Sequence, residues 1–374
     1  MSMDARVREL SASLVTFGFD GSSREAPDHA RRMIERGCVS AILFGRNVDS
    51  PDQVKSLCTS LKEEAQARGR KLLVMTDQEG GRVARLRGSQ NFTEIPSARR
   101  IASCDESVAA ITRIAKVIAA ELKAVKIDMD LAPVLDVDSN PRNPVIGDRS
   151  YSSSARKVGE LGKAFISAMQ AEGVATCAKH FPGHGDTHQD SHEVLPTIAH
   201  GLDRLEAVEI APFREAVSAG VPSILVGHLL VPSLQSAEDA ELGIPASMSA
   251  TIAGFVRDAL GFRGVLLVDD MEMGAVTANF TVGEAIVRAL KGGVDLFLVC
   301  HSEAVQAEAI EAIAAAVERG EVPRARLEAA AERVRRLVNQ YASEAYDTSI
   351  RLVGSPAHRE IVKSILAKCN QDVL

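Results

Sequence analysis

The chain has 374 residues, of which 46% are hydrophobic and 25% are charged, so it can bury one large core or two modest ones. A net charge of −7 and an isoelectric point of about 5.8 argue against a nucleic-acid-binding surface or an anionic-membrane patch and favour a small-molecule partner. The amino terminus has no apolar signal region, and no run of about 18 apolar residues occurs, which predicts a cytoplasmic protein that does not bind membranes.

Six cysteines lie far apart along the chain without paired spacing. Two of them, Cys177 and Cys300, fall in apolar runs typical of buried strands. Buried free thiols are therefore expected, rather than disulfides or a zinc site. Aromatic residues make up only 4% of the chain, which favours a small hydrogen-bonding pocket over a surface that stacks against a polysaccharide.

Short apolar runs alternate with helical patterns along the chain, which is typical of repeated β–α units around a parallel sheet. The expected strands are Leu14–Phe19, Ser40–Phe44, Leu72–Thr76, Met129–Val134, Val174–Ala178, Ser223–Val226, Gly264–Val268 and Asp295–Cys300. The expected helices are Pro27–Arg36, Asp52–Arg68, Glu106–Val125, Ala155–Glu172, Asp203–Ala219, Ala250–Leu260, Thr281–Lys291 and Glu303–Glu318. Eight strands are the number that closes a (β/α)8 barrel.

Polar side chains follow the ends of many of these apolar runs. They are Asp77, Asp136, Lys179 with His180, His228, Asp269 with Asp270, and His301. In a (β/α)8 barrel all strands end on one face, where the active site lies. The pattern predicts an α/β fold of the (β/α)8 TIM-barrel type; the alternative, an open doubly wound sheet, would scatter these groups along an edge.

The barrel is expected to occupy residues 1–340. A Gly-Ser-Pro break at Gly354–Pro356 precedes a helical pattern at Ala357–Cys369. The segment 341–374 is too short for a second domain, so we expect a short C-terminal helical extension packed on the barrel.

The stretch Lys179–Leu195 contains four of the nine histidines, spaced every four residues. On a helix this spacing would align metal ligands, but the intervening proline and glycines disfavour a helix. Because an apolar run precedes it, the stretch is expected to be a long loop after a buried strand. Asp190 and His192 share one side of an extended segment, so the carboxylate can orient the imidazole and support a general acid/base.

A metal site is the alternative use of these groups, since Asp190, His192, His228 and His301 could gather around one ion.

Two further strand ends carry candidate site residues. Asp269 and Asp270 are candidates for a nucleophile or base, or for the N-cap of the next helix. Asp77 and Arg85 flank two adjacent glycines that allow a sharp turn, so they could converge on one ligand or form a surface ion pair. The turn-rich loop Asn140–Tyr151 follows Asp136 and is either structural or part of the site.

The stretch Lys179–His192, K-H-F-P-G-H-G-D-T-H-Q-D-S-H, resembles the most specific motif of glycoside hydrolase family 3, in particular its β-N-acetylglucosaminidase branch of bacterial cell-wall recycling. The resemblance runs from about Leu14 to Arg336. It includes an apolar run ending in Asp at Gly264–Asp269, D-x-E-G-G-R-V-x-R at Asp77–Arg85, and part of N-P-V-I-G-D-R-S at Asn143–Ser150.

The resemblance implies a barrel enzyme that removes terminal β-linked N-acetylglucosamine from small muropeptide-type glycosides with retention of configuration. It implies that Asp269 is the nucleophile and that His192, paired with Asp190, is the general acid/base. It implies no metal and no cofactor, and a monomer or weak homodimer is expected. The residues it assigns to sugar binding are Asp77, Arg85, Arg149, Lys179 and His180.

The chain departs from the family at Val268, where Ser or Thr is common, and at Asp270, an extra carboxylate that could exchange roles with Asp269. A β-glycoside phosphorylase, a β-glucosidase of the same family, a metal-dependent hydrolase and a sugar-binding protein without turnover are the alternatives. A loop from Gly183 to Ser191 is expected to be mobile and to close over the substrate.

Overall fold

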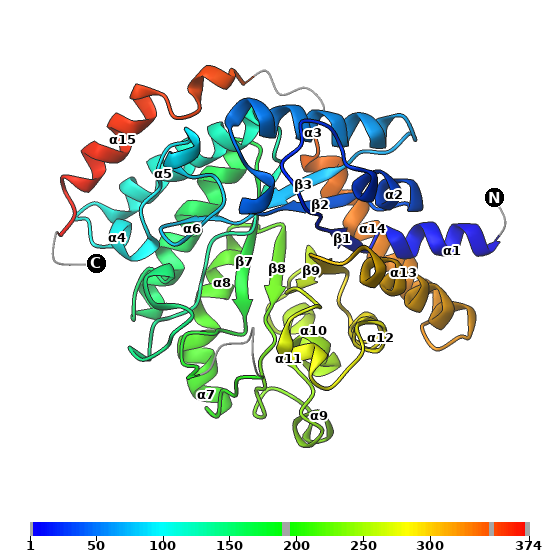
Figure 1. The fold of residues 1–374 in the computed structure, drawn as a ribbon. Coiled ribbons are helices and arrows are strands. Elements are labelled where there is room, and N and C mark those ends of the chain that lie inside the picture. The colour runs from blue at the N-terminus through cyan, green and yellow to red at the C-terminus, as the bar shows by residue number, and fades with distance from the viewer. Residues whose placement is uncertain (1–2, 189–194, 344–347, 371–374) are drawn as a thin grey trace.

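The computed structural model describes residues 3–188, 195–343 and 348–370. Eight parallel strands form a closed barrel in the order β1-β10-β9-β8-β7-β6-β3-β2, with helices around it (Figure 1). The strands are β1 (Val15–Phe17), β2 (Ser40–Leu43), β3 (Leu73–Thr76), β6 (Met129–Asp130), β7 (Ala175–Phe181), β8 (Ser223–Val226), β9 (Val265–Val268) and β10 (Leu296–Val299). The predicted (β/α)8 barrel is confirmed, and the open sheet is excluded because β1 pairs with β10.

The strands read as unbroken apolar runs because both of their faces are covered. The barrel interior lies on one side and the helices on the other, and every residue of β2, β3, β8, β9 and β10 is buried. A small antiparallel hairpin, β4 (Gln78–Gly80) with β5 (Val83–Ala84), lies beyond the end of β3.

Apart from α8, the helices that cover the barrel begin within one residue of where the sequence predicts. They are α2 (Asp28–Arg36), α3 (Pro51–Gln66), α5 (Ser107–Ala124), α6 (Ala155–Ala171), α8 (Ala211–Ser218), α10 (Ala250–Asp258), α12 (Val282–Gly292) and α13 (Glu303–Glu318). Ser50, Thr281 and Ser302 accept backbone N–H groups at the starts of α3, α12 and α13, as N-cap residues do.

Several helices were not predicted, and one predicted helix is divided. The additional helices are α1 (Met3–Ala12), α4 (Ala98–Ala102), α9 (Ala237–Glu241), α11 (Gly274–Thr277) and α14 (Arg324–Tyr341). The predicted helix Asp203–Ala219 consists of α7 (Leu202–Arg204), a π-helical turn η4 (Leu205–Glu209) and α8. Within the described residues, the helices are all too short or too polar to cross a bilayer.

The C-terminal helix α15 (Pro356–Leu366) packs beside α4 and α5 at the edge of the barrel (Figure 1). A disulfide joins Cys104 to Cys369, across a sequence separation of 265 residues. The expectation of free thiols was therefore wrong for this pair, because packing of the C-terminal helix brings together two cysteines that no local spacing relates. The other four, Cys38, Cys58, Cys177 and Cys300, are buried and free.

Candidate active site

A pocket of about 430 Å³ opens where the barrel strands end. Among its lining residues are all five that the sequence assigned to sugar binding, together with Asp269. The charged and histidine side chains of the lining are Asp77, Glu79, Arg85, Arg149, Lys179, His180, His184, Asp269, Asp270 and His301. Residues from distant parts of the chain meet here because parallel strands all end on this face.

Lys179 is the centre of a row of alternating charges. Its Nζ lies 2.7 Å from Asp77 Oδ1 and 2.7 Å from Glu79 Oε1. Arg85 pairs with Asp77 at 3.0 Å, and Arg149 pairs with Glu79 at 2.8 Å. Burial alone would raise the pKa of both carboxyls, but the neighbouring cations outweigh burial and lower it, to about 2 for Glu79. The row therefore presents fixed, charged donors and acceptors suited to sugar hydroxyls.

Lys179 and His180 belong to β7, whereas the sequence placed them in the loop after a strand. The strand continues through Phe181, since Leu135 N–H donates to the Lys179 carbonyl at 2.7 Å and Gly227 N–H donates to the Phe181 carbonyl at 2.9 Å. The predicted strand ended too early because a charged residue usually ends a buried apolar run. Here carboxylates from neighbouring elements neutralise the charge of Lys179. The strand can therefore continue through this residue and bury its side chain.

His180 is oriented by Asp136. Its Nδ1 lies 2.7 Å from Asp136 Oδ2, while Asp136 Oδ1 accepts the backbone N–H groups of His180 at 3.2 Å and of His184 at 2.6 Å. Burial alone would raise the pKa of Asp136, but the charge and hydrogen bond of His180 outweigh it and lower the pKa. This contact assigns the proton to Nδ1 and leaves Nε2, 3.4 Å from Arg149 Nη2, toward the pocket.

Asp269 directly follows β9 and is partly exposed in the pocket. Its backbone N–H donates to the Val226 carbonyl of β8 at 3.3 Å, and its Oδ1 accepts the backbone N–H of Asp270 at 2.9 Å. Burial alone would raise the pKa of Asp269, but the charges of His180 and His228 outweigh it, and the pKa is lowered. Asp269 is therefore an ionised carboxylate at the end of a rigid strand.

Asp270 uses its carboxylate to hold the neighbouring backbone. Its Oδ1 accepts the N–H groups of Glu272 at 3.2 Å and of Cys300 at 3.1 Å, and its Oδ2 lies 3.2 Å from His301 Nε2. The alternative that these carboxylates cap the next helix does not hold, since α11 begins after Met273. Asp270 joins the ends of β9 and β10, which favours Asp269 as the reacting group.

The connection after β7 is packed over its described part. Asn143 Nδ2 donates to the carbonyls of His184 at 2.8 Å and Gly185 at 3.1 Å. A Cβ on Gly185 would lie 1.7 Å from the Val137 carbonyl oxygen, so only glycine allows this approach. These contacts hold residues 183–187 in the described conformation, and the closing motion expected for Gly183–Ser191 stays a prediction, since residues 189–191 lie outside the described residues.

Asp190 and His192 also lie outside the described residues, so their placement relative to Asp269 stays a prediction. Of the alternative metal ligands, His228 and His301 are described, and His301 Nε2 lies 3.2 Å from Asp270 Oδ2. The ring of His228 is engaged on both sides. Its Nδ1 lies 2.7 Å from Ser247 Oγ and its Nε2 lies 3.1 Å from a backbone carbonyl, so both ring nitrogens are occupied. This ligand set is therefore disfavoured.

Sequence reasoning did not assign Glu79, Asp136 or His184 to the site. Glu79 is two positions from Asp77, a spacing that places side chains on one side of an extended segment, and this was a usable signal. Asp136 was noted only as a strand-end residue. Its role as the partner of His180 depends on how β7 lies beside the segment after β6.

Asp130 of β6 is predicted to make stability depend on pH. Its Oδ1 accepts the Gln78 N–H at 2.9 Å, whereas its buried Oδ2 has no partner among the described residues. Burial raises the pKa of Asp130 to about 7, despite the opposing bond from Gln78. This folded-state pKa lies above the unfolded value of about 3.9. The contribution of protonated Asp130 to the stability of the fold is therefore complete below about pH 4 and is lost as the pH rises through about 7.

We expect Asp130→Asn, which cannot ionise, to lose less unfolding free energy between about pH 5 and about pH 8 than the wild type. Urea denaturation at several pH values measures this, with the exposed Asp258→Asn as the control. Identical slopes for wild type and Asp130→Asn would contradict the assignment.

The closed barrel and the charged pocket with an ionised carboxylate at a strand end are those of a (β/α)8-barrel enzyme of the glycoside hydrolase class. Residues 2–337 match the family model described as "Glycosyl hydrolase family 3 N terminal domain". The chain belongs to glycosyl hydrolase family 3.

Named relatives agree with this membership. β-Hexosaminidase A of Pseudoalteromonas piscicida is 33% identical over 355 residues, which cover 90% of this chain and 59% of the relative. The chain thus spans less than two thirds of that protein. A β-hexosaminidase of Idiomarina loihiensis is 34% identical over 275 residues, covering 72% of this chain and 79% of the relative.

Among solved structures, the family 3 β-N-acetylglucosaminidase from Paenibacillus sp. superposes with a TM-score of 0.87 at 37% identity. The match covers 96% of this chain and 68% of that one.

Proposed function

We propose that the chain is a retaining exo-β-N-acetylhexosaminidase that releases terminal β-linked N-acetylglucosamine from small, muropeptide-type glycosides. The observation that carries the proposal is the ionised Asp269 in one small pocket with the Lys179-centred row of charges. The hexosaminidase and N-acetylglucosaminidase names of the relatives support the sugar specificity. A pocket of about 430 Å³ suits one terminal sugar better than an internal stretch of polymer.

In the proposed reaction, the carboxylate of Asp269 attacks the anomeric carbon as the bond to the leaving oxygen breaks, which forms a covalent glycosyl-enzyme. His192, oriented by Asp190, donates a proton to the leaving oxygen. It then takes a proton from the water that attacks the anomeric carbon and releases Asp269. Asp77, Arg85, Arg149, Lys179 and His180 hold the sugar by hydrogen bonds.

Aryl β-glycosides of N-acetylglucosamine, glucose and xylose test this proposal. We expect fastest turnover of the N-acetylglucosaminide, with the β anomer as the first sugar product in proton NMR spectra. An α anomer as the first product would contradict the retaining mechanism. Faster turnover of the glucoside would indicate a β-glucosidase, and formation of sugar 1-phosphate in phosphate buffer would indicate a phosphorylase. Addition of chelator to the assay is not expected to stop turnover, because no step of this reaction uses a metal.

We expect His192→Ala to slow cleavage of substrates with a basic leaving oxygen by about 10²-fold or more, and activated aryl glycosides much less. Acid assistance matters most when the departing oxygen is a poor leaving group. Comparing kcat/KM across a series of leaving groups measures the difference, with His29→Ala as the control. Equal losses across the series would count against the acid role.

The Cys104–Cys369 disulfide bears on location. Disulfides persist mainly outside the reducing cytosol, so this one counts against the expected cytoplasmic location.

A further inference from the structure

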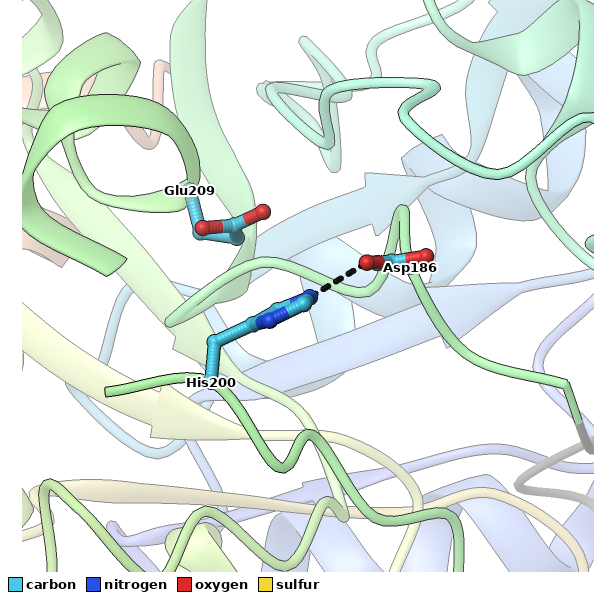
Figure 2. A group of neighbouring side chains, drawn as sticks. All are labelled: Asp186, His200 and Glu209. Atoms are coloured by element: carbon cyan, nitrogen blue, oxygen red, sulfur yellow. Dashed lines mark hydrogen bonds and ion pairs between the residues drawn. The ribbon is translucent and has the colours of Figure 1, made fainter. Parts of the chain in front are cut away.

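Asp186, His200 and Glu209 form a cluster separate from the described lining of the Asp269 pocket (Figure 2). One carboxylate oxygen of Asp186, one ring nitrogen of His200 and one carboxylate oxygen of Glu209 lie within 4.8 Å of one another. The three residues come from the connection after β7, the segment before α7 and the last position of η4. Figure 2 shows both carboxylates near the outer end of the His200 ring.

Glu209 provides an independent indication of a missing ligand. Its side chain is 1% exposed, and its Oε1 lies 3.1 Å from Arg204 Nη2. The other oxygen, Oε2, is buried and has no hydrogen-bond partner among the described residues. The buried Nε of Arg204 also has no partner among the described residues, so the guanidinium of Arg204 leaves Oε2 uncompensated. A buried carboxylate oxygen without a partner is costly, and a cation beside Oε2 would remove that cost.

The backbone around Glu209 is arranged to keep it in this position. Gly183 has φ of +131°, and a Cβ there would lie 2.8 Å from Glu209 Cβ, so glycine lets the connection after β7 lie against the glutamate. Single π-helical turns such as η4 are uncommon and often occur at functional sites. The hydrogen bond between His200 Nε2 and Asp186 Oδ2 brings the other two groups together.

We propose that Asp186, His200 and Glu209 bind one divalent transition-metal cation of the zinc type. An imidazole nitrogen with two carboxylate oxygens is a ligand set that zinc accepts, with water in the fourth position. The cation replaces the proton between His200 and Asp186 and neutralises the unpartnered oxygen of Glu209. Arg204, whose side chain is 40% exposed, can turn toward solvent as the cation takes up the charge of Glu209.

The role of this cation is structural. Asp186 and His200 are 14 residues apart, and Asp190 and His192 lie between them in the sequence. A cation that joins both residues to η4 binds the folded chain and not the unfolded one, so its binding free energy stabilises the fold.

Isothermal titration of chelator-treated protein with Zn²⁺ tests the proposal. We expect one site per chain in the wild type. Loss of a direct ligand in His200→Ala or Glu209→Gln should weaken binding by more than the roughly 10–100-fold that removal of an outer-shell partner causes. His29→Ala, a histidine far from the cluster in the fold, and His192→Ala, which lies outside the ligand set, should bind as the wild type does.

X-ray absorption uses the wild type alone, so it keeps the test valid if a variant fails to fold. X-ray absorption of the Zn²⁺-loaded protein should show only nitrogen and oxygen ligands, including an imidazole, and zinc–sulfur distances of about 2.3 Å would overturn the proposal. Zn²⁺ should also raise Tm of the wild type but not of His200→Ala. No saturable binding, binding unchanged in both cluster variants, or loss of binding in His192→Ala alone would each overturn it.

Discussion

Replacement of Asp269 by alanine is expected to lower kcat by about 10⁴-fold or more, the scale seen when a covalent nucleophile is removed. The side chain is partly exposed, and Asp270 N–H is its hydrogen-bond partner, so the fold should tolerate the change. Steady-state kinetics on an aryl N-acetylglucosaminide measure the loss. Asp258→Ala, which removes an exposed aspartate of α10, should retain wild-type kcat.

Azide distinguishes a nucleophile from a residue that only supports the pocket. In Asp269→Ala, azide can enter the space vacated by the carboxylate and attack the anomeric carbon of an activated substrate. The expected product is the α-glycosyl azide, because a single displacement inverts the β configuration. Undiminished turnover of Asp269→Ala, or azide rescue in Asp270→Ala instead, would remove Asp269 from its proposed role.

Replacement of Lys179 by methionine is expected to lower the unfolding free energy by about 3–5 kcal/mol, as removal of one partner from a buried ion pair does. The ammonium is bonded to Asp77 and Glu79 at 2.7 Å each, and its side chain is 4% exposed. Burial alone would lower the pKa of Lys179, but these carboxylates outweigh it and raise the pKa. Without the ammonium, the carboxylates of Asp77 and Glu79 lose the cation that they share. Sugar binding should weaken as well, since the fixed donor is lost.

The pH dependence of this loss gives a further check. The pKa of Glu79 is lowered to about 2, so its ion pairs stabilise the fold above its unfolded pKa and are lost as the pH falls through the folded value. The difference between wild type and Lys179→Met should be largest near neutral pH and shrink in acid. Lys163→Met removes a lysine 48% exposed, paired with Glu215, and should change stability by less than about 1 kcal/mol. Equal effects of the two substitutions would contradict the argument.

Much of the barrel was predictable because its signals are local. The bounds of β8, Ser223–Val226, agree with the prediction. The bounds of the other strands differ from the predicted ones by a few residues. Buried parallel strands require short apolar runs, and helix starts require a residue such as Ser302 that caps the first turn. The β7 boundary could not be predicted, since a lysine continues that strand only when carboxylates from other elements surround it.

The site was predictable where one residue follows a strand end or belongs to the family motif. Asp269 and His180 were identified in this way, and both line the pocket. Asp136 was missed because its partner His180 belongs to β7, far away in the sequence. Glu79 was missed although its spacing from Asp77 was a usable signal. Asp190 and His192 were identified from the sequence alone, and their role stays a prediction.

The sequence by itself determined the number of strands, the barrel they form, the family and the residues that follow each strand, because apolar periodicity and contiguous motifs are carried by neighbouring residues. Only the tertiary structure decided which charges pair. Lys179 meets Asp77 across 102 residues, Cys104 meets Cys369 across 265, and Asp186, His200 and Glu209 converge from three segments. These contacts depend on strand register and helix packing, which bring side chains together without any regular spacing along the chain.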